Sequence, residues 1–459
     1  MAQPARFEEL KAFAAGGPGR HTWLGIALAI VLGLTIALPA LAAQPVFPLH
    51  VADNRRHLDD ASGAPFLITG DAAWSLIADL PREDVDAYLA DRKARGFNTL
   101  LVNLIESRFS RNAPRNFYGE APFQDGKAFV VPNEAYFEHA DWVLKRAREE
   151  GFLVLLTPAY LGVGGGQEGW YQAMRAAGPQ ALRAYGEYLG RRYRDNPNIL
   201  WVEGGDYDPP DKALVEAVAQ GIAAADPGAL QSLHPSSGTV VRSLWGNAAW
   251  LALDSLYTYG DVAEQAAELY AMQPPRPFFL IESRYEGEGA NAADVRRIAY
   301  GALLSGAAGQ VFGNNPIWHF AGPGVHPSSM PWKAALSSPG AESIRHLKNL
   351  FDHLPWWKLQ PGLGDMAGPA TGAGGKIVGA RADDGSLVIA YLSSAGGISL
   401  KASAIEAMQA RWYDPSSGRT LPAVAEPVSA GMVHFPVPSP ANDSGLSDWV
   451  IFLTPAERS

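Results

Sequence analysis

The sequence has 459 residues, of which 47% are hydrophobic and 18% charged, so it describes a globular protein with a large core rather than a disordered chain. Its formal net charge of -10, with no basic stripe to offset it, argues against a nucleic-acid partner. The chain has no cysteine, which excludes disulfides, thiolate nucleophiles and cysteine-ligated zinc.

The first 43 residues have the layout of a secretory signal peptide. Basic residues come first, an uncharged apolar run extends from Trp23 to Leu38, and the small residues Pro39-Ala40-Leu41-Ala42-Ala43 follow. Cleavage at this small-residue site would export the rest of the chain to a bacterial periplasm or to the exterior. An uncleaved anchor is the alternative, because the apolar run approaches the ~18 residues that can span a bilayer. We expect no stable membrane partner unless the segment remains as such an anchor.

Residues 44–360 alternate between short apolar runs and amphipathic stretches. The expected strands are 66–69, 97–104, 152–157, 199–202, 230–233, 250–259, 278–281 and 308–312, and the clearest helices are 81–94, 136–150, 181–194 and 295–304. This alternation over about 250 residues predicts an α/β fold, a (β/α)₈ TIM barrel. An open doubly wound sheet would need a glycine-rich phosphate loop after its first strand, and Gly70-Asp71-Ala72-Ala73-Trp74 is not one.

A change of composition marks the end of the barrel. Residues 361–375 are rich in Gly, Pro and Ala, as domain boundaries often are. Short apolar runs then follow, separated by turns such as Asp384-Gly385 and Ser416-Ser417-Gly418. We therefore expect residues 361–459 to form a small antiparallel β-sandwich, in which no catalytic cluster is evident.

Two acids stand at the ends of predicted barrel strands. Asp206 follows the run Ile199–Val202 and the pair Gly204-Gly205, and Glu282 directly follows the strand 278–281. Because parallel strands present their carboxyl ends at one face of a barrel, both side chains are expected in one pocket. Glycoside hydrolysis uses such a pair, ~5–5.5 Å apart for retention and ~6.5–9.5 Å apart for inversion.

Other interpretations of the same acids stay open. Asp206 could instead be a loop acid close to the start of the next helix, at Asp208-Pro209-Pro210-Asp211. Glu203 is a rival acid, but strand alternation places it beside Trp201, which favours a buried and hydrogen-bonded structural role. His234 with Asp206 and Glu282 could compose a metal site, although no H-x-H or H-E-x-x-H spacing is present. We expect no metal and no cofactor.

Further strand-end residues are expected to bind the sugar. Acids, amides and aromatic rings at these positions can hydrogen-bond hydroxyl groups or stack on a sugar face. Tyrosines or an arginine beside Glu282 could tune its pKa. The predicted substrate-binding residues are Asp71, Trp74, Asn103, His234, Tyr257, Tyr259, Arg284, Asn314 and Trp318.

With these segments the chain resembles the apiosidase-like glycoside hydrolases, glycoside hydrolase family 140. The most specific matches are Gly70-Asp71-Ala72-Ala73-Trp74 and Trp201-Val202-Glu203-Gly204-Gly205-Asp206. The segments Ile281-Glu282 and Gly313-Asn314-Asn315-Pro316-Ile317-Trp318 match as well, as does Arg411-Trp412-Tyr413-Asp414-Pro415 near the C-terminus. The resemblance covers nearly the whole chain after residue 43, and in this family the barrel precedes a sandwich often labelled a collagen-binding domain.

The resemblance implies that Asp206 is the acid/base, that Glu282 is the nucleophile and that the enzyme cleaves plant-polysaccharide side chains at apiose. Two departures bear on sugar specificity: Ala72 stands where Thr is usual, and the sixth strand carries Tyr257 and Tyr259. We therefore expect a secreted, retaining glycosidase acting on an oligo- or polysaccharide. A carbohydrate-binding barrel without activity and a metal-dependent hydrolase or lyase are the alternatives.

Overall fold

The computed structural model describes residues 44–456 apart from 247, 323, 368–374 and 429–430, so the predicted signal peptide lies outside the described residues. The barrel and the sandwich belong to a single structural unit, Gln44–Ser459. Within these described ranges, no helix combines the length and apolar character needed to cross a membrane.

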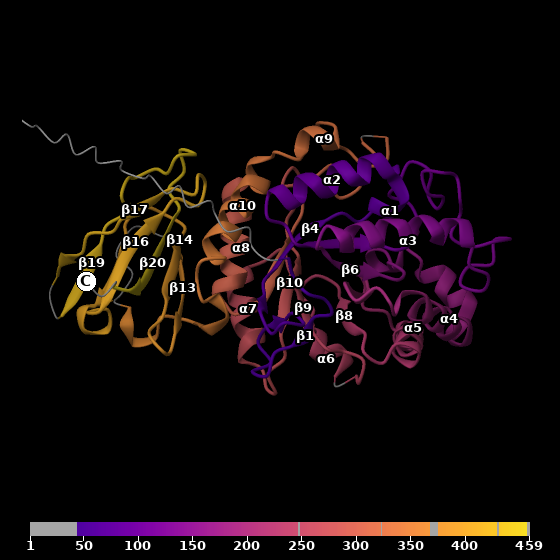
Figure 1. Ribbon diagram of the computed structural model, residues 1–459, viewed down its shortest axis with the longest axis horizontal. Coiled ribbons are helices and arrows are strands. Elements are labelled where there is room, and N and C mark those ends of the chain that lie inside the picture. Colours follow the sequence, from indigo (N-terminus) through magenta and orange to yellow (C-terminus); the bar gives the residue numbers. More distant parts are fainter. Residues whose placement is uncertain (1–43, 247, 323, 368–374, 429–430, 457–459) are drawn as a thin grey trace, which may run out of the picture. The chain divides into compact units, whose positions relative to one another are not determined.

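Eight parallel strands form the barrel, in the spatial order β8-β7-β6-β5-β4-β11-β10-β9 (Figure 1). Backbone and hydroxyl hydrogen bonds close the seam between β8 and β9: Ala252 N–H donates to Gln231 O at 2.9 Å, and Ser232 Oγ donates to Leu253 O at 3.1 Å. The predicted (β/α)₈ barrel is confirmed. Its strands are β4 (Ile68–Ala72), β5 (Thr99–Asn103), β6 (Leu153–Thr157), β7 (Ile199–Gly204), β8 (Leu230–His234), β9 (Asp254–Tyr257), β10 (Phe278–Glu282) and β11 (Gly309–Phe312).

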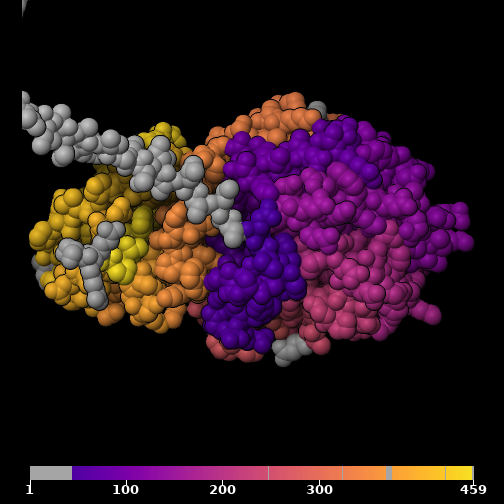
Figure 2. Space-filling view, viewed as in Figure 1, coloured from indigo at the N-terminus to yellow at the C-terminus, as the bar shows by residue number. Residues whose placement is uncertain are grey.

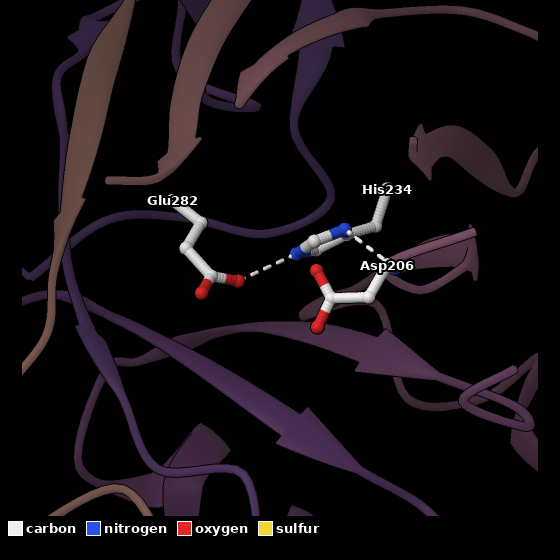
Figure 3. A group of neighbouring side chains, drawn as sticks. All are labelled: Asp206, His234 and Glu282. Atoms are coloured by element: carbon white, nitrogen blue, oxygen red, sulfur yellow. Dashed lines mark hydrogen bonds and ion pairs between the residues drawn. The ribbon is translucent and has the colours of Figure 1, made fainter. Parts of the chain in front are cut away.

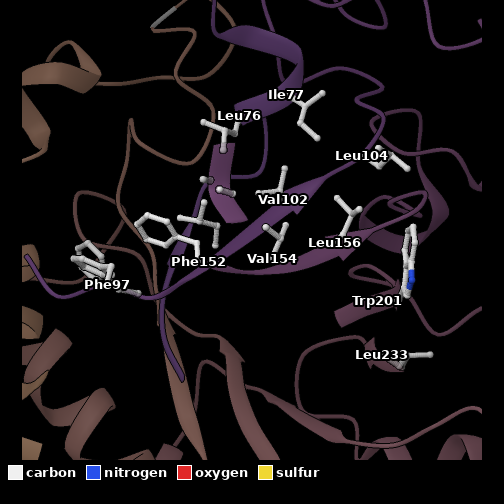
Figure 4. Packing of buried hydrophobic residues seen from close by; sticks show 14 of the residues in the cluster. Leu76, Ile77, Phe97, Val102, Leu104, Phe152, Val154, Leu156, Trp201 and Leu233 are labelled. Carbon is white, nitrogen blue, oxygen red and sulfur yellow. The ribbon is translucent and has the colours of Figure 1, made fainter. Parts of the chain in front are cut away.

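Helices follow the strands and enclose the barrel. Apolar side chains of the helices pack on the outward faces of the strands, where Val102, Leu156 and Trp201 lie in the largest buried cluster (Figure 4). The helices are α1 (Leu76–Asp79), α2 (Arg82–Ala94), α3 (Glu134–Glu149), α4 (Tyr171–Tyr193), α5 (Lys212–Ala225), α6 (Val241–Trp245), α7 (Val262–Ala271), α8 (Ala292–Leu304), α9 (Trp332–Ala335) and α10 (Pro339–Phe351).

Each barrel strand turns alternate residues inward and outward. In β7, Leu200 and Val202 belong to the cluster that fills the barrel, whereas Trp201 between them packs beneath the helices. In β5, Leu101 faces inward and Val102 outward in the same way. This period of two follows from the pleat of the strand. It determines which residues at the strand ends can reach the central pocket.

A small antiparallel sheet packs against the amino-terminal ends of the barrel strands. It consists of β1 (His50–Val51), β2 (Leu58–Asp59) and β3 (Pro65–Phe66), and Figure 2 shows this indigo N-terminal segment as a continuous surface patch. Leu58 and Phe66 pack in the same cluster as Ile68 and Leu153, the first residues of β4 and β6. These apolar contacts cover part of the amino-terminal end of the barrel core.

Two antiparallel sheets form the C-terminal domain and confirm the predicted β-sandwich. One has the order β12-β13-β14-β20-β16-β17 and the other β15-β19-β18. The strands are β12 (Leu359–Pro361), β13 (Ile377–Ala382), β14 (Val388–Leu392), β15 (Ile398–Lys401), β16 (Met408–Tyr413), β17 (Thr420–Pro422), β18 (Glu426–Pro427), β19 (Met432–Phe435) and β20 (Trp449–Pro455).

The central strand β14 of the larger sheet is buried on both faces. In β14, Val388 and Ala390 face the sandwich core, whereas Ile389 and Tyr391 belong to the cluster shared with the barrel helices. A strand covered on both sides has no polar face, which explains the unbroken apolar run of β14. One side of the sheet therefore docks on the barrel, and the other side holds the sandwich together.

Candidate active site

The turn after β7 aims Asp206 into the barrel mouth. Gly204 and Gly205 have φ values of 86° and 127°, and a Cβ at Gly205 would lie 2.3 Å from the ring of Tyr160. Only glycine fits this conformation and this close approach. Asp206 itself has a φ of 54°, a left-handed conformation that aspartate tolerates better than most residues. The sharp turn predicted from the two glycines is confirmed.

Glu282 reaches the same cavity through a bulge in β10. Leu280 pairs with Leu256 of β9, yet Glu282 pairs with Tyr257, so Ile281 is an extra residue in the ladder. Leu280 faces the helices, and simple alternation would send Glu282 to that side as well. Because a bulge shifts the alternation by one residue, the carboxylate of Glu282 turns inward.

His234 at the end of β8 lies beside both acids (Figure 3). Its Nε2 lies 2.8 Å from Glu282 Oε2, and its Nδ1 lies 3.3 Å from the backbone nitrogen of Asp206. One carboxylate oxygen from each acid and one ring nitrogen lie within 4.8 Å of one another. The Tyr160 hydroxyl donates to Asp206 Oδ2 at 2.6 Å. The two carboxylates therefore share one small space.

The contacts of His234 can be satisfied by more than one tautomer. With the proton on Nε2, Nδ1 accepts the Asp206 N–H and Nε2–H donates to Glu282. In the charged ring, Nδ1–H donates to the Pro235 carbonyl 3.1 Å away and Nε2–H still donates to Glu282. With the proton on Nδ1 alone, Nε2 accepts from protonated Glu282. In each form the contact orients the carboxyl group of Glu282.

Burial and mutual charge set the protonation of this group. Burial, and after it the Asp206 carboxylate, raises the pKa of Glu282 to about 7, while His234 partly opposes the rise. Burial by itself would lower the pKa of His234, but its hydrogen bond to Glu282 and the charges of both acids raise it. Adjacent carboxylates resist simultaneous ionisation, so the group retains a proton near neutral pH. A pair that holds one proton can supply an acid and a nucleophile together.

Five predicted binding residues line a cavity of about 530 Å³ that also contains both acids. Two others, His234 and Tyr257, are buried and do not line the cavity, so the predictions that they bind sugar are corrected. Tyr257 packs against the imidazole of His234 with ring centroids 4.9 Å apart. The Tyr257 hydroxyl donates to that of Tyr259 at 2.8 Å. The five residues in the cavity are Trp74, Asn103, Tyr259, Arg284 and Trp318.

Asp71 and Asn314 do not line the cavity, so the predictions that they bind sugar are corrected. Asp71 is fully buried and accepts from Arg92 at 2.5 Å and from Tyr88 at 2.6 Å, both on α2. Asn314 donates to Glu286 at 3.0 Å. The inward positions of β4 and β11 are even- and odd-numbered respectively, so both residues fall on the outward alternation.

Asn103 lines the cavity and has a side-chain acceptor without a partner among the described residues. Glu106, which is 1% exposed, accepts from Asn103 Nδ2 at 3.2 Å and from the backbone nitrogens of three residues that follow it. With its amide nitrogen held in this way, Asn103 Oδ1 is buried and has no partner among the described residues. A sugar hydroxyl that donates to this oxygen would satisfy it.

Several cavity residues were not predicted from the sequence. Tyr285 accepts the indole N–H of Trp74 at 2.9 Å, and Glu288 accepts that of Trp318 at 2.9 Å. His326 contacts Glu288 at 3.1 Å. These residues, with Phe109 and Tyr160, come from loops beyond the strand ends, where no alternation indicates direction. Their polar and aromatic character was the only available signal.

Glu203 is buried on the outward side of β7, as strand alternation predicted. It is 2% exposed, and its side chain has no hydrogen bond within the described part of the chain, so the expected hydrogen-bonded role is corrected. Burial raises its pKa well above the usual value. Glu203 lies outside the cavity and is therefore no rival to Asp206.

The cluster of Asp206, His234 and Glu282 has the composition of a metal site, the alternative raised by the sequence. The ring contacts bear on this alternative, because both nitrogens of His234 already have protein partners: Nε2 contacts Glu282, and Nδ1 contacts the Asp206 N–H and the Pro235 carbonyl. The hydrogen-bonding pattern thus favours a carboxylate pair positioned by a histidine.

Comparison with known families agrees with this geometry. The family model described as "Apiosidase-like, catalytic domain" matches residues 52–358. The chain belongs to the apiosidase-like family. Residues 367–454 match the model described as "Putative collagen-binding domain of a collagenase". A search of curated proteins found no match.

Solved structures resemble the whole arrangement of barrel and sandwich. A protein described as a glycoside hydrolase is 25% identical with a TM-score of 0.78, covering 90% of this chain and 98% of its own. A glycoside hydrolase family 5 protein from Bacteroides vulgatus is 24% identical with a TM-score of 0.75, covering 90% and 94%. A family 5 mannosidase from Rhizomucor miehei shares the barrel at 14% identity and a TM-score of 0.51, covering 68% and 99%. Family and fold together make this apiosidase-like chain a glycosidase.

Proposed function

We propose that this glycosidase removes apiosyl or related pentofuranosyl units from side chains of a plant or bacterial glycan, with retention of configuration. The observation that carries the proposal is the pair Asp206 and Glu282, which face one another across 4.8 Å or less in a sugar-sized cavity. A separation of ~5–5.5 Å suits direct attack by one carboxylate, whereas an inverting enzyme leaves ~6.5–9.5 Å for a water molecule. The apiosidase-like family supports the choice of sugar.

Glu282 is the proposed nucleophile. The hydrogen bond with His234 orients its carboxylate and opposes the rise of its pKa, so that Glu282 becomes ionised, as attack on the anomeric carbon requires, above about pH 7. Asp206 is the proposed acid/base, since it lines the cavity together with Glu282 and is close enough to act on the same glycosidic bond. Its Oδ2 accepts from the Tyr160 hydroxyl.

The reaction then takes two steps. Asp206 gives its proton to the glycosidic oxygen while Glu282 bonds to the anomeric carbon and the carbon–oxygen bond breaks. The leaving alcohol departs, and a water molecule takes its place. Asp206 removes a proton from this water, its oxygen bonds to the anomeric carbon and Glu282 is released. The sugar is held in the cavity by polar contact with Asn103 and by the rings of Trp74 and Trp318, all of which line it.

We also propose that the protein acts outside the cytoplasm, because a polymeric plant glycan is too large to enter a bacterial cell intact. The signal-like pattern of residues 1–43 supports this proposal.

The test is hydrolysis of aryl glycosides and pectic fragments by the wild type and by Asp206→Asn and Glu282→Gln. We expect each substitution to lower kcat at least ~10³-fold, because each removes a complete acid–base or nucleophilic role. Bound glycan and an unchanged unfolding midpoint would serve as controls for folding. Activity within tenfold of wild type in either variant would refute the assignment, and loss of wild-type activity on chelation would favour the metal alternative.

A further inference from the structure

A second hollow of about 290 Å³ adjoins the catalytic cavity. Tyr259, Ser283 and Arg284 line both spaces. Its far wall comes from the sandwich, through residues of β13 and β14 and their flanks that include Lys376 and Ser393. The barrel alone therefore supplies only part of this hollow, which shares three lining residues with the space that holds Asp206 and Glu282.

The sandwich wall is fixed to the barrel by buried contacts. On α8, which lies against β13 and β14 (Figure 1), Arg296 donates to both oxygens of Asp448 at 2.6 and 2.8 Å. Tyr391 of β14 also donates to Asp448, at 3.0 Å, and its ring stacks on Tyr300 of α8 with centroids 5.1 Å apart. Both ends of the Arg296–Asp448 pair are at most 2% exposed. These contacts hold the sandwich side of the hollow in a fixed position, and such preorganisation lowers the entropic cost of binding a ligand.

The hollow is rich in hydrogen-bond donors. Arg284 donates to the Tyr259 carbonyl at 3.2 Å, Arg297 donates to Asp294 at 2.6 Å, and Lys376 pairs with Asp261. These contacts leave several N–H groups of each cation unused, since a guanidinium has five and an ammonium three. The ion pairs of Arg297 and Lys376 are exposed and contribute little to stability, so a ligand can replace them.

The ring of Tyr259 stands at the junction of the two spaces. It is 46% exposed, unusual for a large aromatic side chain, and its hydroxyl is fixed by Tyr257. An exposed ring with a fixed hydroxyl is a suitable platform for the face of a sugar. A glycan that passes over it would have one residue at the acids and its neighbour in the hollow.

We infer that the sandwich completes a glycan-binding subsite, in which Arg297 and Lys376 hold the sugar residue next to the one being cleaved. This inference rests on the proposed function and extends it: the ligand is a second, oxygen-rich sugar residue of the same glycan, bound through its hydroxyl and ring oxygens. The sandwich thus selects oligosaccharides over simple glycosides, a role distinct from any binding of collagen.

The test compares a short and a long substrate in the double variant Arg297→Ala/Lys376→Ala. With an apiose-bearing pectic oligosaccharide we expect KM to rise about tenfold, since two polar contacts are lost. With 4-nitrophenyl apiofuranoside, which ends at the first sugar, kcat and KM should stay within twofold. The control is Lys401→Ala, an equally exposed sandwich lysine paired with Asp365 away from the hollow, which should change neither substrate.

Equal KM values for the oligosaccharide in the wild type and the double variant would overturn the inference, as would a parallel loss on both substrates. If the wild type cleaves neither, the proposed function fails, and the subsite is judged by calorimetric binding of the same oligosaccharide to uncleaving Glu282→Gln. Binding that weakens about tenfold when the two cations are also removed supports the subsite. Unchanged binding, or none in Glu282→Gln itself, overturns it.

Discussion

At the scale of single residues, His234 couples the geometry of the active site to its ionisation. Its Nε2 contacts the Glu282 carboxylate, and its Nδ1 contacts the backbone of Asp206, so one ring spans two strands and both acids. The residue is fully buried and touches no part of the cavity directly. It is therefore a positioning residue, and its effect should appear in the pH profile.

Replacement of His234 by Ala should raise the pKa of Glu282, because the histidine is the group that lowers it. A nucleophile must be ionised, so kcat/KM falls as the pH drops below the pKa of Glu282. The acidic limb should thus move to higher pH in His234→Ala, by about one unit, and kcat should drop about tenfold or more. His234→Gln, which can still donate a hydrogen bond from its amide, should partly restore the position of the acidic limb and the value of kcat. A limb that stays in place in His234→Ala would show that the ring only fills space.

Whether a residue predicted at a strand end lines the cavity depends on strand alternation. Asp71 and Asn314 lie on outward positions. The outward position of Asp71 could have been predicted from the sequence, because its apolar neighbours alternate between the two faces of the strand. Tyr160 and Glu288 could not have been placed, since loop residues follow no period. Asp206 was predictable because the preceding glycines mark the turn.

At the scale of elements, the bulge in β10 is the feature that the sequence concealed. Phe278 through Glu282 is an apolar run ending in an acid, and simple alternation from Leu280 sends that acid toward the helices. The register shift opposite Tyr257 reverses its direction. An extra residue in a ladder depends on the neighbouring strand, so no pattern within β10 itself reveals it.

Helix α8 carries two adjacent arginines, of which one forms a buried ion pair and the other an exposed ion pair. Arg296 makes the buried bidentate contact with Asp448, whereas the adjacent Arg297 pairs with Asp294 at the surface. Arg296→Ala should lower the free energy of unfolding by about 3–5 kcal/mol, because Asp448 is left charged and buried. Arg297→Ala should cost about 1 kcal/mol or less.

Denaturant unfolding of the two variants measures this difference. Equal midpoints in Arg296→Ala and Arg297→Ala would mean that the barrel and the sandwich are not joined through α8. In that case the fixed wall of the second hollow would lose its support as well.

At the scale of the whole molecule, the order of domains and the barrel architecture could be predicted from the sequence. Eight apolar runs with helices between them leave few alternatives, and the turn-rich segment after them indicates a second fold. The docking of the sandwich on the barrel could not be predicted from the sequence, since it depends on side chains from distant elements, such as Arg296 and Asp448. Neither residue carries a local pattern that indicates a buried pair.

The central claim is that Asp206 and Glu282 act on one glycosidic bond as acid/base and nucleophile. Rescue by azide of Asp206→Ala and Glu282→Ala, with an activated aryl glycoside as substrate, tests it most directly. Azide should attack the glycosyl intermediate in Asp206→Ala and give a glycosyl azide of retained configuration. In Glu282→Ala it should enter the vacated space and give the inverted azide. The same configuration from both variants, or no rescue of either, would contradict the account.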